Sequence, residues 1–184
     1  MGEIGSDKYV SEIIHTMIYD QSKRVSYNIG NALLFVNQDK MLQEAEKIVS
    51  ELPDFVNKEG LLNIFNKTAD KSRKWLNEDI IPTIMDDTLS LTKRINSVRT
   101  LRNYNFKDAV PKLLTILEEE NIPVKLKTVI VEAMGWYNYS YERANIIATL
   151  GSIIEDEGTA IPLLNEAVKT RNRLISGCNV PITP

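Results

Sequence analysis

The stretch SVRTLRNYNFKDAVPKLLTILEEEN (residues 97–121) decides the fold, because its helix-turn-helix pattern recurs further along the chain. A second copy is VIVEAMGWYNYSYERANIIATLGSIIEDEG (residues 129–158), and a third begins at NEAVKTRNRL (residues 165–174). In the register of these copies, Val98 corresponds to Val131 and then to Asn165. A period of about 33 residues built from two helices is typical of a solenoid, because each helix pair buries its apolar face only against its neighbours.

A second recurring pattern marks the starts of helices: a capping residue, two apolar residues and then proline. It occurs at residues 79–82, 108–111 and 159–162, and Pro123 marks a fourth start. Proline in a first helical turn loses no hydrogen bond, because the first N–H groups of a helix have no partner within it. In the N-terminal part, Asp39 is the expected N-cap of an amphipathic helix that ends before Pro53.

The chain is thus predicted to be one all-α domain covering residues 1–184. Amphipathic stripes predict divergent helices over residues 1–78, where the segment around residues 61–78 fits either one helix or two. The repeats occupy residues 79–174, and a mobile tail is expected over residues 175–184.

The segment from about Ile95 to Leu174 resembles HEAT repeats, with LRNYNFKDAVPKLLTIL and VEAMGWYNYSYERANIIATL standing for the end of one helix, the turn and the second helix. This armadillo-type group also includes the phycobilisome-lyase-like repeats. The resemblance implies a right-handed α-α superhelix that acts as a protein-protein interaction scaffold through the second helix of each pair. It carries no lyase residue over to this chain and implies no cofactor.

Composition restricts the class of partner. The chain has 184 residues, 43% of them hydrophobic, which is enough for a continuous core, and a formal net charge of -3 that disfavours a general polyanion binder. No apolar run long enough for a membrane span occurs, and the single cysteine, Cys178, excludes an internal disulfide. The compartment stays open: the cytoplasm is favoured, with the periplasm or export as the alternative if a signal segment has been removed.

The second copy departs from the usual turn, because WYNYSY replaces small polar residues. One interpretation is an aromatic contact patch, since Trp, Tyr and Arg anchor many interfaces. The alternative, which the general tendency of aromatic rings to be buried favours, is packing between helices. With two positions from the expected inner face, the candidate partner-binding residues are Trp136, Tyr139, Tyr141, Arg143, Lys112 and Glu119.

A nucleic-acid interface is the second hypothesis. Two basic clusters form a positive stripe if stacked helices bring them together, and such a stripe tracks phosphates. Some DNA glycosylases are built from HEAT-like repeats, but their base-binding motif of aromatics with a carboxylate is not recognisable here. The residues of this alternative are Lys71, Arg73, Lys74, Lys93, Arg94, Arg99 and Arg102.

No combination of residues predicts catalysis or a metal site. His15 is the only histidine and falls outside the apolar stripe of its helix, so we expect it to be solvated. The carboxylates at residues 86–87 and 118–120 are expected at helix ends or on a solvated face. The sequence therefore predicts a protein that is not an enzyme, and the lack of a polar cap after Leu174 predicts a solenoid end that can form a homo-oligomer.

Overall fold

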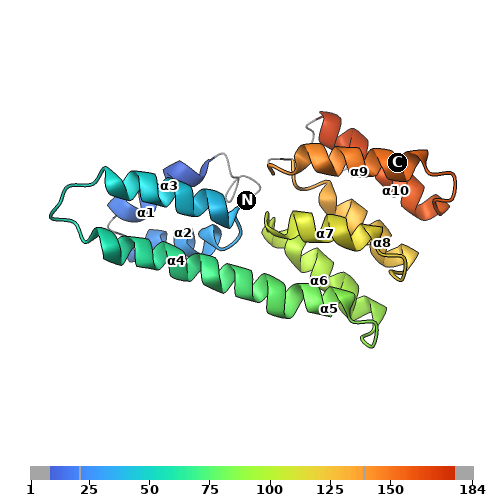
Figure 1. Ribbon diagram of the computed structural model, residues 1–184, viewed down its shortest axis with the longest axis horizontal. Coiled ribbons are helices and arrows are strands. Elements are labelled where there is room, and N and C mark those ends of the chain that lie inside the picture. Colours follow the sequence, from blue (N-terminus) through green and yellow to red (C-terminus); the bar gives the residue numbers. More distant parts are fainter. Residues whose placement is uncertain (1–8, 21, 139, 177–184) are drawn as a thin grey trace. The chain divides into compact units, whose positions relative to one another are not determined.

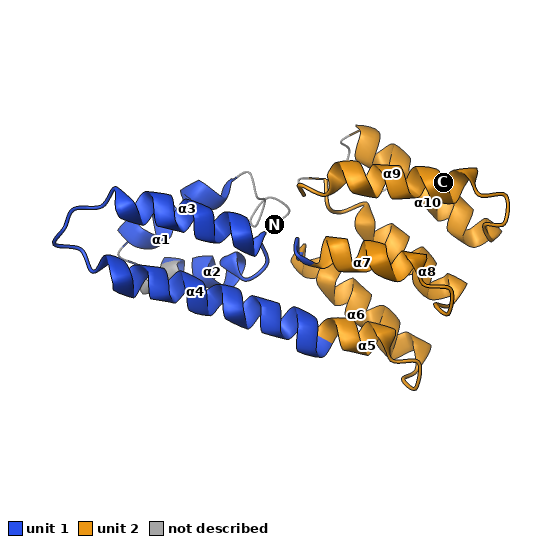
Figure 2. Cartoon of the chain, in the orientation of Figure 1, with its two compact units in different colours: residues 1–79, 106–108 blue, residues 80–105, 109–184 orange. Residues whose placement is uncertain are grey.

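The computed structural model of the chain describes residues 9–20, 22–138 and 140–176. These residues form helices joined by turns and loops, with no β-strand among them (Figure 1). This confirms the all-α prediction. The chain divides into two compact units (Figure 2): unit 1 comprises residues 1–79 and 106–108, and unit 2 comprises residues 80–105 and 109–184. The sequence predicts one domain over residues 1–184 with repeats from residue 79, and the two units divide after residue 79.

The described part of unit 1 contains four α-helices and one π-helical turn. They are α1 (Val10–Tyr19), α2 (Lys23–Leu33), α3 (Gln38–Ser50), α4 (Lys58–Lys74) and η2 (Trp75–Ile80), whose last residue already belongs to unit 2. The segment for which the sequence allowed one helix or two is therefore a continuous helical run that changes to π-type hydrogen bonding at Trp75.

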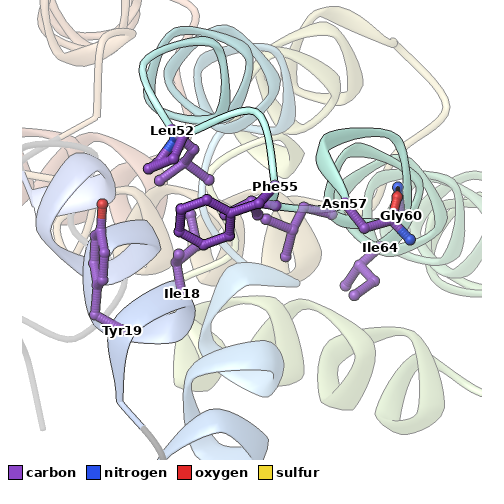
Figure 3. A pocket seen from close by; sticks show the side chains of 10 residues that line it. Ile18, Tyr19, Leu52, Phe55, Asn57, Gly60 and Ile64 are labelled. Atoms are coloured by element: carbon purple, nitrogen blue, oxygen red, sulfur yellow. Dashed lines mark hydrogen bonds between the residues drawn. The ribbon is translucent and has the colours of Figure 1, made fainter.

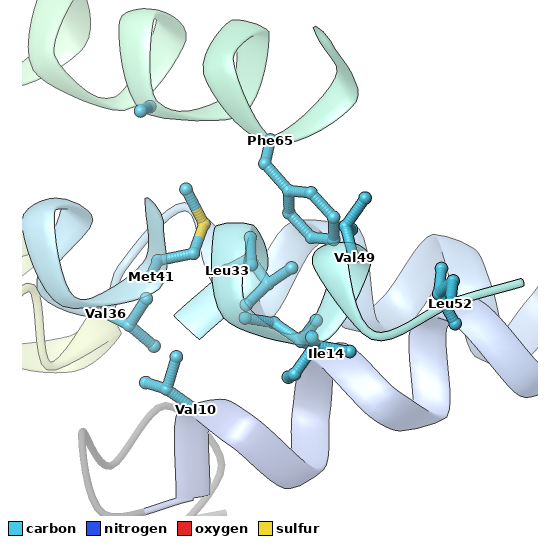
Figure 4. Close-up of a cluster of buried hydrophobic side chains, with 11 residues drawn as sticks. Val10, Ile14, Leu33, Val36, Met41, Val49, Leu52 and Phe65 are labelled. Carbon is cyan, nitrogen blue, oxygen red and sulfur yellow. The ribbon is translucent and has the colours of Figure 1, made fainter. Parts of the chain in front are cut away.

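The core of unit 1 lies around α3, which packs against α1 and α4. Met41, Ala45 and Val49 occupy one face of α3 and are buried, as their spacing along a helix predicts. They meet Ile14 of α1 and Phe65 of α4 in one apolar cluster (Figure 4). Burying a valine, isoleucine, methionine or phenylalanine side chain contributes about 1.5–3 kcal/mol relative to exposure, so this cluster stabilises unit 1.

The cap of α3 differs from the prediction. Asn37, not Asp39, is the N-cap, and its Oδ1 accepts a hydrogen bond from the Lys40 amide at 2.8 Å. Asp39 lies inside the first turn and pairs with Arg73 at 2.7 Å. Asp108 accepts hydrogen bonds from the Asn37 side chain and the Gln38 amide within unit 1. Caps depend on which donor lies within reach, and the sequence does not distinguish candidates that lie so close together.

Among the described residues of unit 2, four helices begin at or next to the proline-marked positions. Pro82 lies in the first turn of α5, Pro111 and Pro162 follow the first residues of α7 and α10, and Pro123 is the N-cap of α8. Asp79, however, lies within η2 and does not cap α5. The helices are α5 (Ile81–Met85), α6 (Leu91–Tyr104), α7 (Ala109–Glu118), α8 (Val124–Met134), α9 (Arg143–Glu155) and α10 (Ile161–Ser176).

The helices of unit 2 pack in sequence-adjacent pairs, α5 with α6, α7 with α8 and α9 with α10, while α8 also packs against both α6 and α10. Leu101, Met134 and Ala167 lie at equal intervals along the chain and are all fully buried. The predicted register instead matched Val131 with Asn165, and Asn165 is exposed. Burial thus shifts the register of the third copy by a single position.

The C-terminal helix extends through Ser176, into the predicted tail. The remainder of that tail, with Cys178, lies outside the described residues.

Candidate functional site

A pocket of about 630 Å³ opens at one end of unit 1, between the end of α1, the loop after α3 and the start of α4 (Figure 3). Its lining is almost entirely apolar. Three large side chains in it are exposed to solvent: Phe55 at 90%, Tyr19 at 63% and Ile64 at 44%. The other lining residues are Ile18, Leu52, Pro53, Val56, Asn57, Gly60 and Leu61.

Local hydrogen bonds fix the loop that presents Phe55. The Val56 amide donates to the Pro53 carbonyl at 3.0 Å, which closes a turn with Phe55 near its tip. Asn57 then caps α4, and its Oδ1 accepts from the Gly60 amide at 2.9 Å. A Cβ on Gly60 would lie 2.7 Å from Asn57 Nδ2, so a side chain there would displace the capping amide. Hydrogen bonds therefore hold the backbone on both sides of the exposed Phe55.

Several residues that line this pocket have an acidic neighbour in the sequence. Among the residues next in sequence to its lining, Asp20, Glu51, Asp54 and Glu59 are acidic, and Lys58 is the one base. The Lys58 ammonium donates to Asp54 and to the Ser50 carbonyl, both at 3.3 Å.

A second hollow of about 670 Å³ shares Asn57 and Gly60 with the first. Along α4 it is lined by Glu59, Leu62, Asn63 and Asn66. The apolar pocket therefore continues into a surface of amides and one carboxylate.

The predicted aromatic patch of unit 2 is mostly packed. Tyr137 is fully buried, and this burial raises its pKa well above the ordinary value. The Arg173 guanidinium lies over the Trp136 ring, 5.6 Å from its centroid. Gly135 permits this contact, because a Cβ there would lie 2.8 Å from Arg173 Nη1.

The other residues of that patch have separate environments. Arg143 donates to the Leu174 carbonyl at 2.7 Å, which ties the start of α9 to α10. Tyr141 is 62% exposed, and Tyr139 lies outside the described residues. Lys112 and Glu119 are exposed on α7 and just after it. Tyr141, Lys112 and Glu119 thus remain accessible, whereas Trp136 and Arg143 take part in packing.

The basic residues on α4 belong to unit 1. Lys71 is exposed, Arg73 pairs with Asp39 and Lys74 lies 3.8 Å from Glu78. Two of these three cations therefore already have a carboxylate partner.

The basic residues on α6 belong to unit 2 and serve different roles. Arg94 is 4% exposed and its Nε donates to the Ile84 carbonyl at 2.8 Å, so it joins α6 to α5. Arg102 pairs with Glu132 of α8 at 2.7 Å. Lys93 and Arg99 are exposed. The sequence could not distinguish these roles, because every arginine on a helix has the same local signal.

Within the described ranges no group of three or more His, Cys, Asp or Glu residues is arranged to hold a metal ion. His15 is exposed and stacks on Tyr19. Asp86 accepts hydrogen bonds from the Thr88 hydroxyl and amide, which hold its pKa below the ordinary value and close the turn after α5. A helix with the length and apolar character needed to cross a bilayer is absent from the described residues.

Comparisons with known protein families, with characterised proteins and with solved structures found no match to this chain.

Proposed function

We propose that this protein is a non-catalytic protein-binding module whose main contact surface is the apolar pocket of unit 1. One observation carries this proposal: Phe55, Tyr19 and Ile64 present large apolar surface to solvent around a single pocket. Exposed apolar patches rimmed by polar residues mark interaction sites in soluble proteins, because leaving them in water is unfavourable. The surface was not among the predicted contact residues; the loop PDFVN after a helix end was its only sequence signal.

We further propose that unit 2 is a HEAT-type α-solenoid. The support is its packing: α8 contacts its neighbour in the pair and also α6 and α10, so helices of successive pairs form a layer. A solenoid requires this nearest-neighbour packing. In such a scaffold, Tyr141, Lys112 and Glu119 are the accessible candidates for a second contact surface.

The nucleic-acid alternative has less support. Arg94 is buried, and Arg73, Lys74 and Arg102 have carboxylates nearby. A phosphate contact by a paired cation must first break that pair, which lowers the gain from counterion release.

Affinity capture from a lysate of the source organism tests the proposal, using the wild type and the Phe55→Asp variant. Ile161→Asp is the matched control, because Ile161 is 71% exposed on unit 2 and Asp is favourable in a first helical turn. We expect a protein that the wild type and the control retain and Phe55→Asp loses. A Tyr141→Asp variant tests the second surface. Capture that is equal on wild type and Phe55→Asp would reject the pocket as the contact surface.

A further inference from the structure

We propose that the pocket of unit 1 takes a basic amphipathic segment of its partner, with apolar side chains that enter the pocket and arginine or lysine residues beside them. This inference rests on the proposed function and adds the chemistry of the partner. It combines three properties of the same surface: an apolar hollow, exposed aromatic rings and an excess of carboxylates.

The hollow selects for apolar anchors. Its lining includes Ile18, Leu52 and Leu61 together with the open Phe55 ring, and apart from the Tyr19 hydroxyl only the Asn57 side chain is polar. A charged group placed against the aliphatic side chains would lose water without gaining a hydrogen-bond partner there. The side chain that enters must therefore be apolar. The volume of the hollow, about 630 Å³, lies within the range of pockets that hold ligands.

The edge of the hollow selects for cations. Glu51, Asp54 and Glu59 are exposed and are the sequence neighbours of lining residues, and Glu59 also lines the second hollow. The ammonium of Lys58 lies against Asp54 and the Ser50 carbonyl. Because complementary charge acts mainly on specificity and association rate, the rim favours a basic partner and repels an acidic one.

The aromatic rings add to the same preference. Phe55 and Tyr19 expose ring surface to solvent, and such faces attract the guanidinium of arginine or the ammonium of lysine. The apolar stem of either residue also packs on a ring while its charged head stays in water. The residue before Phe55 is Asp54, whose side chain is fully exposed although Lys58 lies 3.3 Å from one of its oxygens, so an arginine that crosses the ring can approach the other oxygen.

The second hollow extends the contact along α4. Asn63 and Asn66 line it beside Glu59. Their carboxamides supply both donors and acceptors, which suits the polar side of an amphipathic segment. One continuous surface thus offers an apolar end and a polar, negatively charged end.

Three fluorescein-labelled peptides of equal length test the inference by fluorescence anisotropy with the full chain. One carries leucine on one face and arginine on the other face of an amphipathic helical pattern. The second replaces arginine by glutamate, and the third replaces leucine by serine. We expect the leucine-arginine peptide to bind at least about tenfold more tightly than either of the others, since it alone satisfies both the hollow and the rim. Raising the salt concentration should weaken that complex by about threefold or more.

Two variants and one control locate the binding. Phe55→Ser should remove most of the affinity. Glu51→Gln combined with Asp54→Asn and Glu59→Gln should lower the affinity and its salt dependence while leaving the apolar lining intact. The control replaces Glu120, Glu155 and Glu157 by glutamine, which removes the same charge from exposed positions of unit 2 and should change nothing.

The outcomes separate this inference from the proposed function. If the leucine-glutamate peptide binds equally well and Phe55→Ser abolishes both complexes, the pocket is a binding site but the basic preference is wrong. If the leucine-arginine peptide binds Phe55→Ser and wild type alike, or binds neither, the inference is overturned, whereas the capture experiment still decides the proposed function. Self-association by light scattering that Phe55→Ser removes would replace the peptide with a second copy of this chain.

Discussion

Each unit carries aromatic residues in a loop between helices, and the two loops use them in opposite ways. In the loop after α3, Phe55 is almost fully exposed, whereas in the loop after α8, Tyr137 is fully buried and Trp136 is covered by Arg173. In the denser aromatic cluster of the sequence, Trp136 and Tyr137 are therefore packed, whereas Tyr141 is exposed. A single phenylalanine in a short polar loop marks the accessible surface, so aromatic density alone does not indicate a binding site.

The physical cause lies in what surrounds each loop. Helix α10 packs against α8, and the missing side chain of Gly135, just after α8, admits Arg173 of α10. In unit 1, Leu52 lies just after α3 and is buried in the core. The turn that follows it places Phe55 in solvent. The comparison yields four predictions, ordered by the size of the expected effect.

The largest effect should come from truncating buried rings. Tyr137→Ala in unit 2 and Phe65→Ala in unit 1 should each lower the free energy of unfolding by about 3–5 kcal/mol, because each leaves a cavity in a packed core. Urea denaturation followed by circular dichroism measures this. A loss below about 1 kcal/mol for Tyr137→Ala would mean that the unit 2 loop is not packed as described.

The second prediction concerns alkaline pH. Burial raises the pKa of Tyr137, so its contribution to stability is fully present below the unfolded tyrosine pKa of about 10 and is lost as pH rises above it. Between about pH 10 and 12, wild-type stability should fall more steeply than that of Tyr137→Phe, by about 1.4 kcal/mol per pH unit. Parallel slopes for the two proteins in denaturation series across this range would contradict burial of the hydroxyl.

The third prediction compares two glycines. Gly135→Ala should destabilise by about 1–2 kcal/mol, because the new methyl group displaces Arg173 from Trp136. Gly151→Ala, in the interior of α9 with open space around it, should stabilise by about 0.5–1 kcal/mol through helix propensity. Thermal unfolding measures both. Equal shifts of the same sign would show that Arg173 moves aside without cost.

The smallest effect is expected at the exposed ring. Phe55→Ala should change the free energy of unfolding by less than about 0.5 kcal/mol, since the side chain has little to lose on truncation. The same denaturation experiment, with Phe65→Ala as the buried counterpart, measures it. A loss of about 2 kcal/mol or more would place Phe55 in a core and remove the basis for the proposed binding surface.

Prediction from sequence succeeded where a local rule determines the outcome. The prolines at positions 111, 123 and 162 marked helix starts correctly, because a proline restricts the backbone wherever it lies. The apolar stripe on α3 identified its buried face, because the spacing of apolar residues along a helix determines which of them share a face. The cap of α3 and the register of the third copy were wrong, because each depends on a choice between nearby residues that only contacts resolve.

The candidate site shows the same division more sharply. Tyr141, Lys112 and Glu119 were predicted as contact residues and are exposed, but Arg94 was predicted as a phosphate ligand and is buried against α5. The pocket around Phe55 was not predicted at all. Its lining comes from the end of α1 and the start of α4, which are far apart in the sequence, so no local sequence pattern could predict it.

The sequence by itself determined the helical class and the three helix starts marked by Pro111, Pro123 and Pro162, because helix formation follows from spacing and backbone restriction within a few residues. Only the tertiary structure decided which aromatic and basic side chains reach solvent. The burial of a residue depends on every segment packed around it. Arg173 covers Trp136 from a helix far along the chain, and the pocket beside Phe55 is formed partly by Ile18 and Tyr19 of α1.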